Sequence, residues 1–526
     1  MRLIYTFLFI ILFHFTLFPA GPKRELRGVW VATVSNIDWP SARNYNGIKQ
    51  KNEFVDLLNS HQKTGINAVF VQIRTAADAL YAKSPEPWST FLSGLQGQPP
   101  SPYYDPLAFM IEESHARGIE FHAWLNLNRA SISTNSLLDA NHLVRKHPDW
   151  IIKYHGQFIL NFGLPEVRQY LVNLVKNLIE QYDVDGIHFD DYFYPYPMKG
   201  EEIKDQEAFE KYKLPEESLG DWRRRNTNNL IKDISDVIKS TKPKVKFGIS
   251  PFGIWRHQSD VVLDGSPTRR GLQSYDDLFA DTEKWIKDGL VDYLAPQLYW
   301  ETSHKVAAFE PLAKWWSAHN YGRPIYIGHA VYHLNDAWAP SELSKQLKVA
   351  RSLPNVQGSI YFSSNLIARN VKGWRDTLRQ NQYSSVALIP AMLWKDSIAP
   401  TPPHQVSLLK KGDDWLLAWK PGEPSEDQDP AAYYVVYRIK KGEIDPLENA
   451  ENIIFKGKMN QLILDKNWIQ SNISISDKIN TFRGMHYQRQ PFSQAKLVKV
   501  IRGKIMDYIV DLRTESPDFM KLQEFE

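Results

Sequence analysis

Short apolar runs alternate with amphipathic segments eight times between residues 25 and about 380. Such apolar runs are typical of buried strands, and apolar residues at helical spacing are typical of helices that pack on one face. Eight strand–helix units predict an α/β domain folded as a (β/α)₈ TIM barrel. The expected strands are Leu26–Thr33, Ala68–Arg74, Glu120–Leu125, Gly186–Asp190, Lys246–Ser250, Tyr293–Leu298, Ile325–His329 and Gly358–Phe362.

Helices are expected between these strands. A doubly wound sheet is the alternative α/β fold, but it does not need eight units and usually carries a Gly-rich phosphate loop after its first strand. The sequence has no such loop at that place. The expected helices are Lys49–Lys63, Pro106–Arg117, Pro165–Tyr182, Trp222–Ser240, Asp276–Lys287, Phe309–His319 and Ser341–Ser352.

The fourth strand leads directly into two carboxylates and an aromatic cluster, in the sequence VDGIHFDDYFYP. Side chains alternate along a strand, so His188 and Asp190 are expected to point into the barrel if Ile187 and Phe189 face the helices. Asp191 would then lie at the rim. An Asp pair can also cap a helix or bind a metal ion, but the flanking His and Tyr side chains favour a sugar-cleaving site.

The residues that follow each strand are the other candidates, because barrel enzymes carry their chemistry at the C-terminal strand ends. Amide, carboxylate, arginine and aromatic side chains recur there, as expected for a sugar-binding cleft. No metal ligand is expected, since no second His lies at ligand spacing from His188, and no cofactor is expected. The candidate substrate-binding residues are Asp38, Trp39, Arg74, Trp124, Asn126, Asn128, His188, Tyr192, Gln297, Tyr299 and Trp300.

Several phrases in residues 24–380 resemble, in order, those of the glycosyl-hydrolase-like family 10 of bacterial envelope proteins. The resemblance implies a barrel with glycoside hydrolase activity, and peptidoglycan-type glycan strands are a substrate suggested for similar proteins. The strand-four phrase is also similar to that of amylase-like barrels, which implies Asp190 as nucleophile. The phrases are Glu25–Val34 with Asp38–Pro40, Glu86–Ser89, Tyr104–Leu107, His122–Asn126, Asp185–Pro195, Ile249–Gly253 and Ala295–Trp300.

Glycosidic bond cleavage needs one group to protonate the leaving oxygen and another to attack carbon or activate water. Asp190 and Asp191 would point to opposite sides of a strand, unless the strand ends at Asp190 and the chain turns. Glu86 and Glu301 are therefore candidates for the second acid, and Glu86 is favoured because it lies in a family-like phrase. An ion pair with an arginine is the alternative for Glu86. The candidate catalytic residues are Asp190, Asp191 and Glu86.

Residues 1–20 are typical of a secretory signal, with Arg2 followed by the apolar stretch Leu3–Phe18 and the small residue Ala20. An uncleaved membrane anchor is the alternative. The chain has no cysteine, which excludes disulfides and thiolate metal sites. Its formal net charge is only +3, and the sequence has no basic run typical of nucleic-acid binding. We expect a protein exported across the inner membrane, periplasmic, in the cell envelope or extracellular, with no membrane span in the mature chain and a polysaccharide as its partner.

The character of the sequence changes beyond the barrel, which is expected over 24–394. A proline-rich linker, Ala399–Pro403, precedes strands at Val406–Leu409, Trp415–Trp419 and Tyr433–Arg438. These strands resemble the first half of a fibronectin type III module, expected over 399–457, with Trp415 and Trp419 in its core. The closing strands of such a module are not expected after Ile453.

Residues 468–519 resemble the cupin-type dTDP-4-dehydrorhamnose 3,5-epimerases. Carried over from that family, His486 would be the base and Lys496 its partner. The sequence ends at Glu526, before the remaining strands of that family, so residues 468–526 are expected to be a truncated cupin-like fragment. We expect no epimerase activity from this segment, which would be a fusion remnant or an assembly artefact. The phrases are Ile469–Asn472, Arg483–Gln488, Lys496–Val498 and Val510–Arg513.

Two functions therefore remain open. The first is an exported glycoside hydrolase that acts on a polysaccharide through Asp190 and its partners. The second is a catalytically silent glycan-binding barrel that uses the same aromatic and amide cleft.

Overall fold

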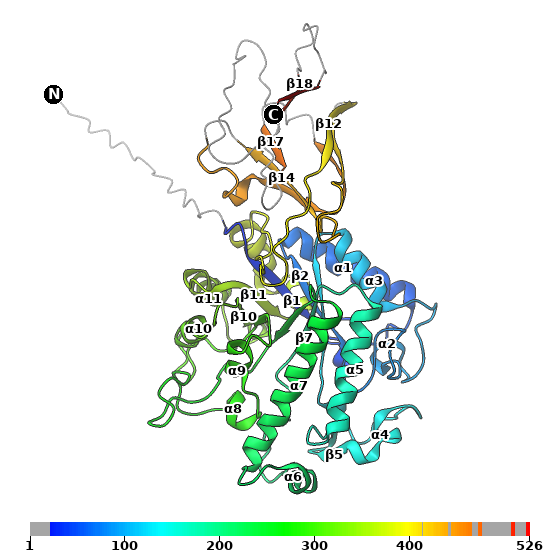
Figure 1. Ribbon diagram of the computed structural model, residues 1–526, viewed down its shortest axis with the longest axis vertical. Coiled ribbons are helices and arrows are strands. Elements are labelled where there is room, and N and C mark those ends of the chain that lie inside the picture. Colours follow the sequence, from blue (N-terminus) through cyan, green and yellow to red (C-terminus); the bar gives the residue numbers. More distant parts are fainter. Residues whose placement is uncertain are drawn as a thin grey trace, which may run out of the picture.

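A computed structural model describes residues 21–412, 414–439, 443–464, 472–475, 507–510 and 522–525. Eight parallel strands close into a barrel in chain order, which confirms the predicted fold (Figure 1). The sixth strand is much shorter than expected, because Pro296 lies in the run and a proline cannot donate to a strand ladder. The barrel strands are β1 Leu26–Val31, β2 Ala68–Arg74, β3 Glu120–Leu125, β7 Gly186–Phe189, β8 Lys246–Ile249, β9 Tyr293–Leu294, β10 Ile325–Ala330 and β11 Val356–Phe362.

Helices surround the barrel at the expected places. Their ends follow local chemistry: α1 begins after Asn46, whose side chain accepts from two backbone N–H groups, and ends at Gly65, whose φ is 91°. The helix expected over Asp276–Lys287 is two short helices, α8 (Ser274–Asp277) and α9 (Thr282–Lys287). The others are α1 Gly47–Thr64, α3 Pro106–Ala116, α5 Pro165–Gln181, α7 Leu219–Thr241, α10 Phe309–Ala318 and α11 Pro340–Ser352.

Aromatic rings fill the interior of the barrel. The strand-four alternation is as expected, with Ile187 and Phe189 packed among the helices and His188 inside. Glycines on neighbouring strands make room for these rings: a Cβ at Gly248 would lie 1.9 Å from the ring of Tyr293. The interior is therefore a packed core, and a ligand can reach only its ends. The inner apolar residues are Leu26, Trp30, Ala32, Ala68, Phe70, Trp124, Tyr293, Ala295, Tyr326, Ile360 and Met392.

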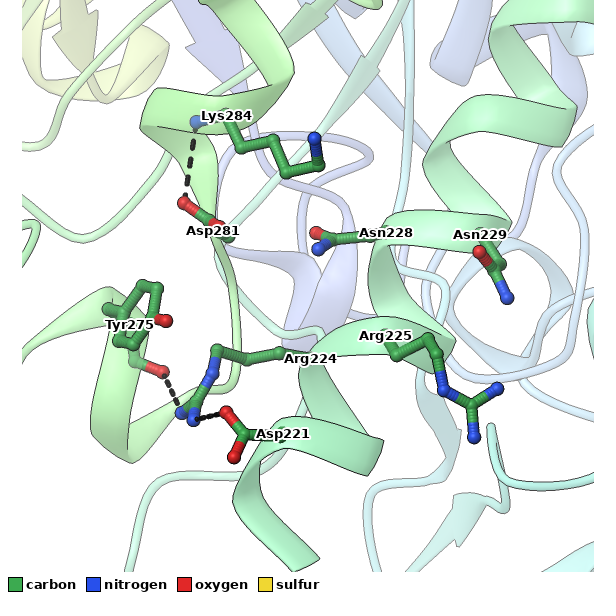
Figure 2. Close-up of a pocket in the computed structure, with 8 residues that line it drawn as sticks. All are labelled: Asp221, Arg224, Arg225, Asn228, Asn229, Tyr275, Asp281 and Lys284. Carbon is green, nitrogen blue, oxygen red and sulfur yellow. Dashed lines mark hydrogen bonds and ion pairs between the residues drawn. The ribbon is translucent and has the colours of Figure 1, made fainter. Parts of the chain in front are cut away.

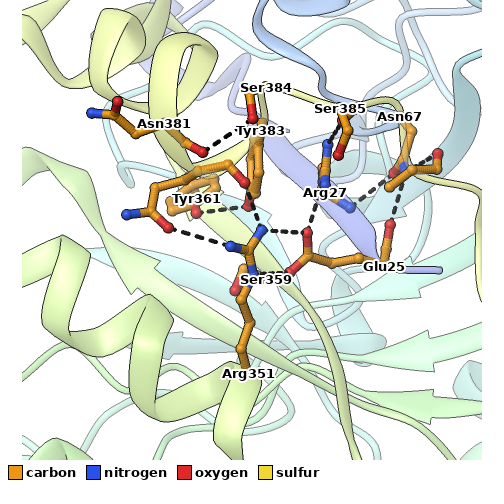
Figure 3. A network of polar contacts seen from close by, with 12 residues as sticks. Glu25, Arg27, Asn67, Arg351, Ser359, Tyr361, Asn381, Tyr383, Ser384 and Ser385 are labelled. Atoms are coloured by element: carbon orange, nitrogen blue, oxygen red, sulfur yellow. Dashed lines mark hydrogen bonds and ion pairs between the residues drawn. The ribbon is translucent and has the colours of Figure 1, made fainter. Parts of the chain in front are cut away.

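A buried ion-pair network lies where the first strand begins (Figure 3). Glu25 accepts hydrogen bonds from Arg27 Nε and Arg351 Nε, both at 2.7 Å. Arg27 also donates to the Ser385 carbonyl at 2.7 Å and lies 4.2 Å over the ring of Tyr383. The network joins β1, α11 and the segment after the last barrel strand, which stabilises the closure of the barrel.

A small antiparallel sheet is inserted between β3 and α5, and the sequence patterns did not predict it. Its strands are β4 (Arg129–Ser131), β6 (Gln157–Leu160) and β5 (Ile151–Tyr154), in that spatial order. The strands are only three or four residues long, which is too short for a clear alternation. Because β4 follows the C-terminal end of β3, this sheet forms one wall of the barrel mouth.

Two three-stranded sheets follow the barrel, ordered β12-β13-β16 and β15-β14-β17. The expectation that the strands stop after Ile453 was wrong, because β16 pairs with β13 and β17 pairs with β14. Both added strands are only four residues long and carry polar residues, which hid them in the sequence. Likeness to a fibronectin type III module stays a prediction. The strands are β12 His404–Lys411, β13 Asp414–Lys420, β14 Tyr434–Ile439, β15 Ile453–Gly457, β16 Gln461–Leu464 and β17 Asn472–Ile475.

The core of this region contains Trp419, which is 2% exposed and packs against Tyr434 and Phe455, whereas Trp415 is only half-buried at its edge. Farther along, β18 (Asp507–Val510) pairs with β19 (Leu522–Phe525). His486 and Lys496 lie outside the described residues.

The β15-β14-β17 sheet packs against the N-terminal end of the barrel strands. Lys456 Nζ donates to the carbonyl of Gly118, just before β3, at 3.0 Å, and Lys23 pairs with Glu448 at 2.8 Å. The barrel unit itself extends slightly beyond residue 394, because Lys395 pairs with the buried Asp292 at 2.8 Å. Across the residues that the structure describes, no helix combines the length and the apolar character that crossing a bilayer requires.

Candidate active site

The two carboxylates at the end of β7 lie close enough for the charge of Asp190 to raise the pKa of Asp191. The strand ends at Phe189, and the chain bends at Asp191. The backbone N–H of Tyr192 donates to Asp190 Oδ1 at 3.2 Å, which stabilises this bend. Next to it, the rings of Tyr192 and Tyr196 stack with centroids 5.2 Å apart. The turn that would let both carboxylates work at one site is therefore present.

Asp190 is held by side chains from the end of β3. Trp124 Nε1 and Asn126 Nδ2 each donate to Asp190 Oδ2 at 3.0 Å. Burial raises the pKa of Asp190, and the charge of Arg129 and these hydrogen bonds only partly oppose the rise. Asn126 is itself oriented, because its Oδ1 accepts from the Arg129 N–H at 2.9 Å. The donors fix the carboxylate in one orientation at the base of the mouth.

Asp191 has a different set of partners. Gln297 Nε2 donates to its Oδ1 at 3.2 Å, and the hydroxyl of Tyr196 donates to its Oδ2. Burial and the charge of Asp190 raise the pKa of Asp191 to about 6, against these two hydrogen bonds. Gln297 is held by the carbonyl of Ser250 at 3.0 Å. A carboxyl group with such a pKa can carry a proton near neutral pH, as a general acid must.

Asp38 is a third buried carboxylate at this end of the barrel. It accepts from the Ala32 N–H at 2.7 Å, from Ser363 Oγ at 2.7 Å and from the Asn365 N–H at 2.8 Å. Burial raises its pKa to about 6, although these bonds lower it. Its bonds join the loop after β1 to the residues after β11. Asp38 therefore orders the rim, and contact with substrate stays a prediction.

Glu86 is not free to act as an acid, contrary to the first expectation. Its carboxylate forms a two-point ion pair with Arg74, at 2.7 Å to Nε and 2.6 Å to Nη2. The two side chains are 1% and 0% exposed, and Tyr170 also donates to Glu86 at 3.2 Å. Arg74 further donates to the carbonyl of Asn126. The pair thus supports the loop that carries Asn126, and the sealed Arg74 does not contact substrate.

His188 lies below the mouth and has no exposed surface, which contradicts its expected contact with substrate. Its Nε2 accepts from Trp30 Nε1 at 3.1 Å, and its Nδ1 is hydrogen-bonded to the Tyr293 hydroxyl at 3.1 Å. Burial lowers the pKa of His188 well below its usual value. Since both ring nitrogens already have partners, His188 is a neutral part of the barrel core.

Trp39 and Asn128 are also structural, contrary to expectation. Trp39 is 1% exposed and donates to the Gln50 carbonyl at 2.9 Å, because its ring packs against α1 rather than the mouth. Asn128 is 2% exposed, and its side chain donates to the Leu160 carbonyl at 3.1 Å. That bond holds the inserted sheet against the end of β3.

Aromatic rings line the remaining rim. Tyr299 and Trp300 are half-buried and pack against Tyr332 and Phe252, with centroids 5.9 Å and 5.6 Å apart. Arg129 lies 4.6 Å over the ring of Tyr192. Sequence reasoning overlooked Tyr196, Ser250 and Phe252 as site residues, whereas Tyr332 was already expected at a strand end of this face. The signal for Tyr196 was available, because the aromatic run after Asp191 continues to that position.

A separate cavity of about 270 Å³ lies on the outer helical layer (Figure 2). No residue of a barrel strand lines it, and its cations are already paired: Arg224 with Asp221 at 2.6 Å and Lys284 with Asp288 at 2.6 Å. It is not an extension of the mouth. Its lining residues are Asp221, Arg224, Arg225, Asn228, Asn229, Tyr275, Asp281 and Lys284.

The C-terminal region matches the family model of dTDP-4-dehydrorhamnose 3,5-epimerase over residues 454–526. An epimerase from Sinorhizobium fredii is 44% identical over 59 residues, which cover 11% of this chain and 30% of that protein. The likeness to this second family is therefore confirmed for a short segment. The chain spans less than a third of that relative.

Two relatives of the barrel region share the description "glycosyl hydrolase". "Glycosyl hydrolase YngK" of Bacillus subtilis is 44% identical over 431 residues, 80% of this chain and 84% of that protein. "Glycosyl hydrolase DigH" of Escherichia coli K12 is 38% identical over 389 residues, 66% of this chain and 87% of the relative. A solved glycoside hydrolase domain of PgaB from Bordetella bronchiseptica aligns with a TM-score of 0.45 and 12% identity, over 68% of this chain and 99% of the domain.

The family model "Glycosyl hydrolase-like 10" matches residues 25–344, which include all the barrel strands but the last. This match and the two relatives confirm the resemblance found in the sequence. The chain belongs to the glycosyl hydrolase-like 10 family and is an enzyme of the glycoside hydrolase type.

Proposed function

We propose that this enzyme cleaves glycosidic bonds in a peptidoglycan-type glycan strand, with Asp190 and Asp191 as its catalytic carboxylates. The observation that supports the pair is the unequal environment of these two neighbouring carboxylates. Burial raises the pKa of both groups. The charge of Arg129 and the donors Trp124 and Asn126 oppose the rise at Asp190, whereas the charge of Asp190 adds to it at Asp191 and brings that pKa to about 6. Glycoside hydrolysis needs such a pair, one group ionised and the other protonated.

Asp191 is the proton donor in this proposal. In its protonated form it transfers a proton to the oxygen that leaves, and the hydrogen bond from Gln297 Nε2 at 3.2 Å keeps the carboxyl group oriented. Tyr196 holds its other oxygen. The nearby negative charge of Asp190 favours the protonated state of Asp191, which is why neighbouring residues can take opposite roles.

Asp190 is the ionised partner. Its carboxylate stabilises the positive charge that develops on the sugar ring and acts as nucleophile or as base for water. Trp124 and Asn126 hold the carboxylate so that little reorganisation is needed during the reaction. The anomeric configuration of the first product distinguishes the two roles, because a nucleophile retains configuration and a base inverts it.

A glycan strand as substrate is supported by the lining of the mouth. The half-buried rings of Tyr192, Tyr299 and Trp300 offer flat apolar faces beside amide and carboxylate groups. Sugar rings present both apolar faces and hydroxyl edges, so a mixed surface suits them. Export belongs to the same proposal, because an envelope glycan lies outside the cytoplasm. The signal-like residues 1–20 lie outside the described residues.

One observation favours a catalytically silent glycan-binding barrel as the second candidate. Glu86, the acid expected from another strand end, is sealed in its ion pair with Arg74. If Asp191 does not transfer a proton, the described mouth still binds sugars through its rings and amides. The two candidates differ in one measurable property, which is whether glycan chains become shorter.

The test is digestion of purified peptidoglycan glycan strands, followed by sizing of the products. We expect cleavage by the wild-type enzyme and much weaker cleavage by Asp191→Asn. The loss in Asp191→Asn should be smaller for an aryl glycoside, because a good leaving group needs less protonation. Equal losses for both substrates would contradict the acid role, and binding without cleavage by the wild type would support the silent barrel. Retention of a chain lacking residues 2–20 in the cytoplasm would support export.

A further inference from the structure

A cavity of about 270 Å³ opens between the loops that follow β2 and β3. Ala76 and Asp78 contribute to it from the loop after β2, and Ser131 contributes from β4. Both loops leave the C-terminal ends of barrel strands. The cavity therefore lies at the same end of the barrel as Asp190 and Asp191.

Asp78 offers this cavity one carboxylate oxygen. The residue is 2% exposed, and its Oδ1 accepts from the Thr75 N–H at 3.1 Å, from Thr75 Oγ1 at 2.6 Å and from the Ala76 N–H at 2.9 Å. Within the described part of the chain, its Oδ2 accepts no hydrogen bond and has no cationic partner. Asp78 lines the cavity and a carboxylate oxygen is a strong acceptor, so Oδ2 is suited to a ligand hydroxyl or amide N–H.

Apolar side chains surround the same cavity. Leu95, Ile132 and Leu137 line it and remain 55%, 43% and 84% exposed. Exposed apolar side chains gathered around a polar hollow are typical of a ligand-binding surface. A carboxylate acceptor beside apolar walls fits a sugar unit that presents hydroxyl or amide N–H donors together with an apolar face or an acetyl methyl group.

A continuous stretch of chain links the cavity to the catalytic pocket. Asn126 donates to Asp190 at 3.0 Å, Arg129 lies 4.6 Å over Tyr192, and Ser131 lines the cavity. The five residue steps from Asn126 to Ser131 span at most about 17 Å of chain. A glycan strand bound at Asp190 can therefore continue along β4 into the cavity.

We propose that this cavity is a separate sugar subsite that binds an N-acetylated hexose unit of the same glycan strand. Asp78 Oδ2 accepts from the amide or a hydroxyl of that unit, and Leu95 and Ile132 cover its apolar side. The subsite rests on the proposed function, because its ligand is another unit of the strand that Asp190 and Asp191 cleave. It predicts that affinity and turnover depend on chain length.

The test compares short and long N-acetylglucosamine oligomers as substrates of the full chain. Asp78→Asn keeps an Oδ1 acceptor for the Thr75 and Ala76 donors but replaces the free acceptor by an N–H donor. We expect Asp78→Asn to lower kcat/KM for the long oligomers about tenfold more than for the short ones. Leu95→Ser should act in the same direction. An unchanged ratio in both folded variants would overturn the subsite.

Leu409→Ser is the matched control, because Leu409 is 50% exposed in β12, away from the mouth. Its ratio should equal that of the wild type. Titration of the same oligomers into an Asp190→Asn chain, with and without Asp78→Asn, measures binding without cleavage. If the wild type cleaves nothing but Asp78→Asn weakens binding of long oligomers about tenfold, the subsite stands and the hydrolase proposal fails. Equal binding would refute the subsite alone.

Discussion

At the N-terminal ends of the barrel strands, buried or part-buried carboxylates pair with Arg or Lys side chains, as Glu25, Glu120 and Asp292 do. At the mouth, Asp190 and Asp191 instead accept hydrogen bonds from neutral groups. Burial alone would raise the pKa of Glu25, but Arg351 and Arg27 outweigh it and the pKa is lowered. Lys246 has the same effect on Glu120. The structure thus separates carboxylates that are held in ion pairs and stabilise the fold from carboxylates whose burial is only partly offset by nearby donors and charge.

The two kinds of carboxylate therefore differ in whether they can exchange a proton. A carboxylate paired with a cation stays ionised and cannot exchange a proton near neutral pH. A buried carboxylate with neutral partners is costly to ionise, which raises the pKa of Asp191 to about 6. Residues with such shifted pKa values gather at catalytic sites. The carboxylates at the mouth therefore contribute less to the free energy of unfolding than the ion-paired carboxylates at the other end of the barrel.

Replacement of Asp190 by Asn should separate turnover from stability most clearly. Asn has the size of Asp and retains one acceptor for Trp124 and Asn126, but it carries no charge. We expect kcat on a glycan strand to fall about ten-thousandfold, since the loss acts on the transition state. Thermal unfolding should show a native or slightly higher Tm. Retained turnover in Asp190→Asn would remove Asp190 from the mechanism.

Replacement of Glu25 by Gln should have the opposite profile. It leaves the buried Arg27 and the partly buried Arg351 without their carboxylate, which costs about 3 kcal/mol of unfolding free energy. The pKa of Glu25 is lowered in the fold, so the stability difference should be full above pH 4.5 and shrink as the pH falls below it. Urea unfolding at two pH values measures this. Turnover by the folded fraction should remain native; a catalytic defect without a loss of stability would contradict the comparison.

Glu86→Gln tests which of the two groups Glu86 belongs to. Its sequence position suggests the mouth, but its ion pair with Arg74 resembles those at the other end. We expect a loss of about 3 kcal/mol in stability and a smaller fall in turnover, caused by displacement of Asn126. The fall should be equal for good and poor leaving groups. A selective loss with poor leaving groups would restore Glu86 as the acid.

Truncation tests where the barrel ends. A chain that ends at Leu393 loses the hydrogen bond from Trp394 to Asp292 at 2.7 Å and the ion pair from Lys395 at 2.8 Å. A chain that ends at Ile398 keeps both. We expect the shorter chain to be less stable by about 2 kcal/mol, with equal activity in the folded state. Equal Tm values would show that the contacts of Asp292 do not stabilise the barrel.

Tyr196→Phe should have the smallest effect. The hydrogen bond from Tyr196 lowers the pKa of Asp191, so its loss should raise that pKa above about 6. An acid with a higher pKa stays protonated to higher pH, so the alkaline limb of the kcat/KM profile should move upward. Tyr321→Phe serves as the control, since the hydroxyl of Tyr321 donates to Glu283, away from the mouth. A downward shift, or none, would contradict the acid role of Asp191.

Local patterns in the sequence were sufficient for the barrel and for the position of Asp190. The strand bounds depend on apolar runs that each strand carries by itself, and alternation along β7 correctly predicted Ile187 and Phe189 outside and His188 inside. The patterns failed for β4 because Arg129–Ser131 carries no apolar run, and for β16 because its apolar run is only three residues long. The sequence by itself therefore determined the fold, the family and the strand end that carries the carboxylates.

Only the tertiary structure decided what each side chain at that end can do. Arg74 and Glu86 both looked like site residues, and their ion pair became visible only when the loop after β2 was placed. The same holds for Asp191, whose partners Tyr196 and Gln297 come from separate parts of the chain. A pKa depends on the sum of burial and of all nearby charges and donors, most of them distant in sequence, and no local pattern contains that sum.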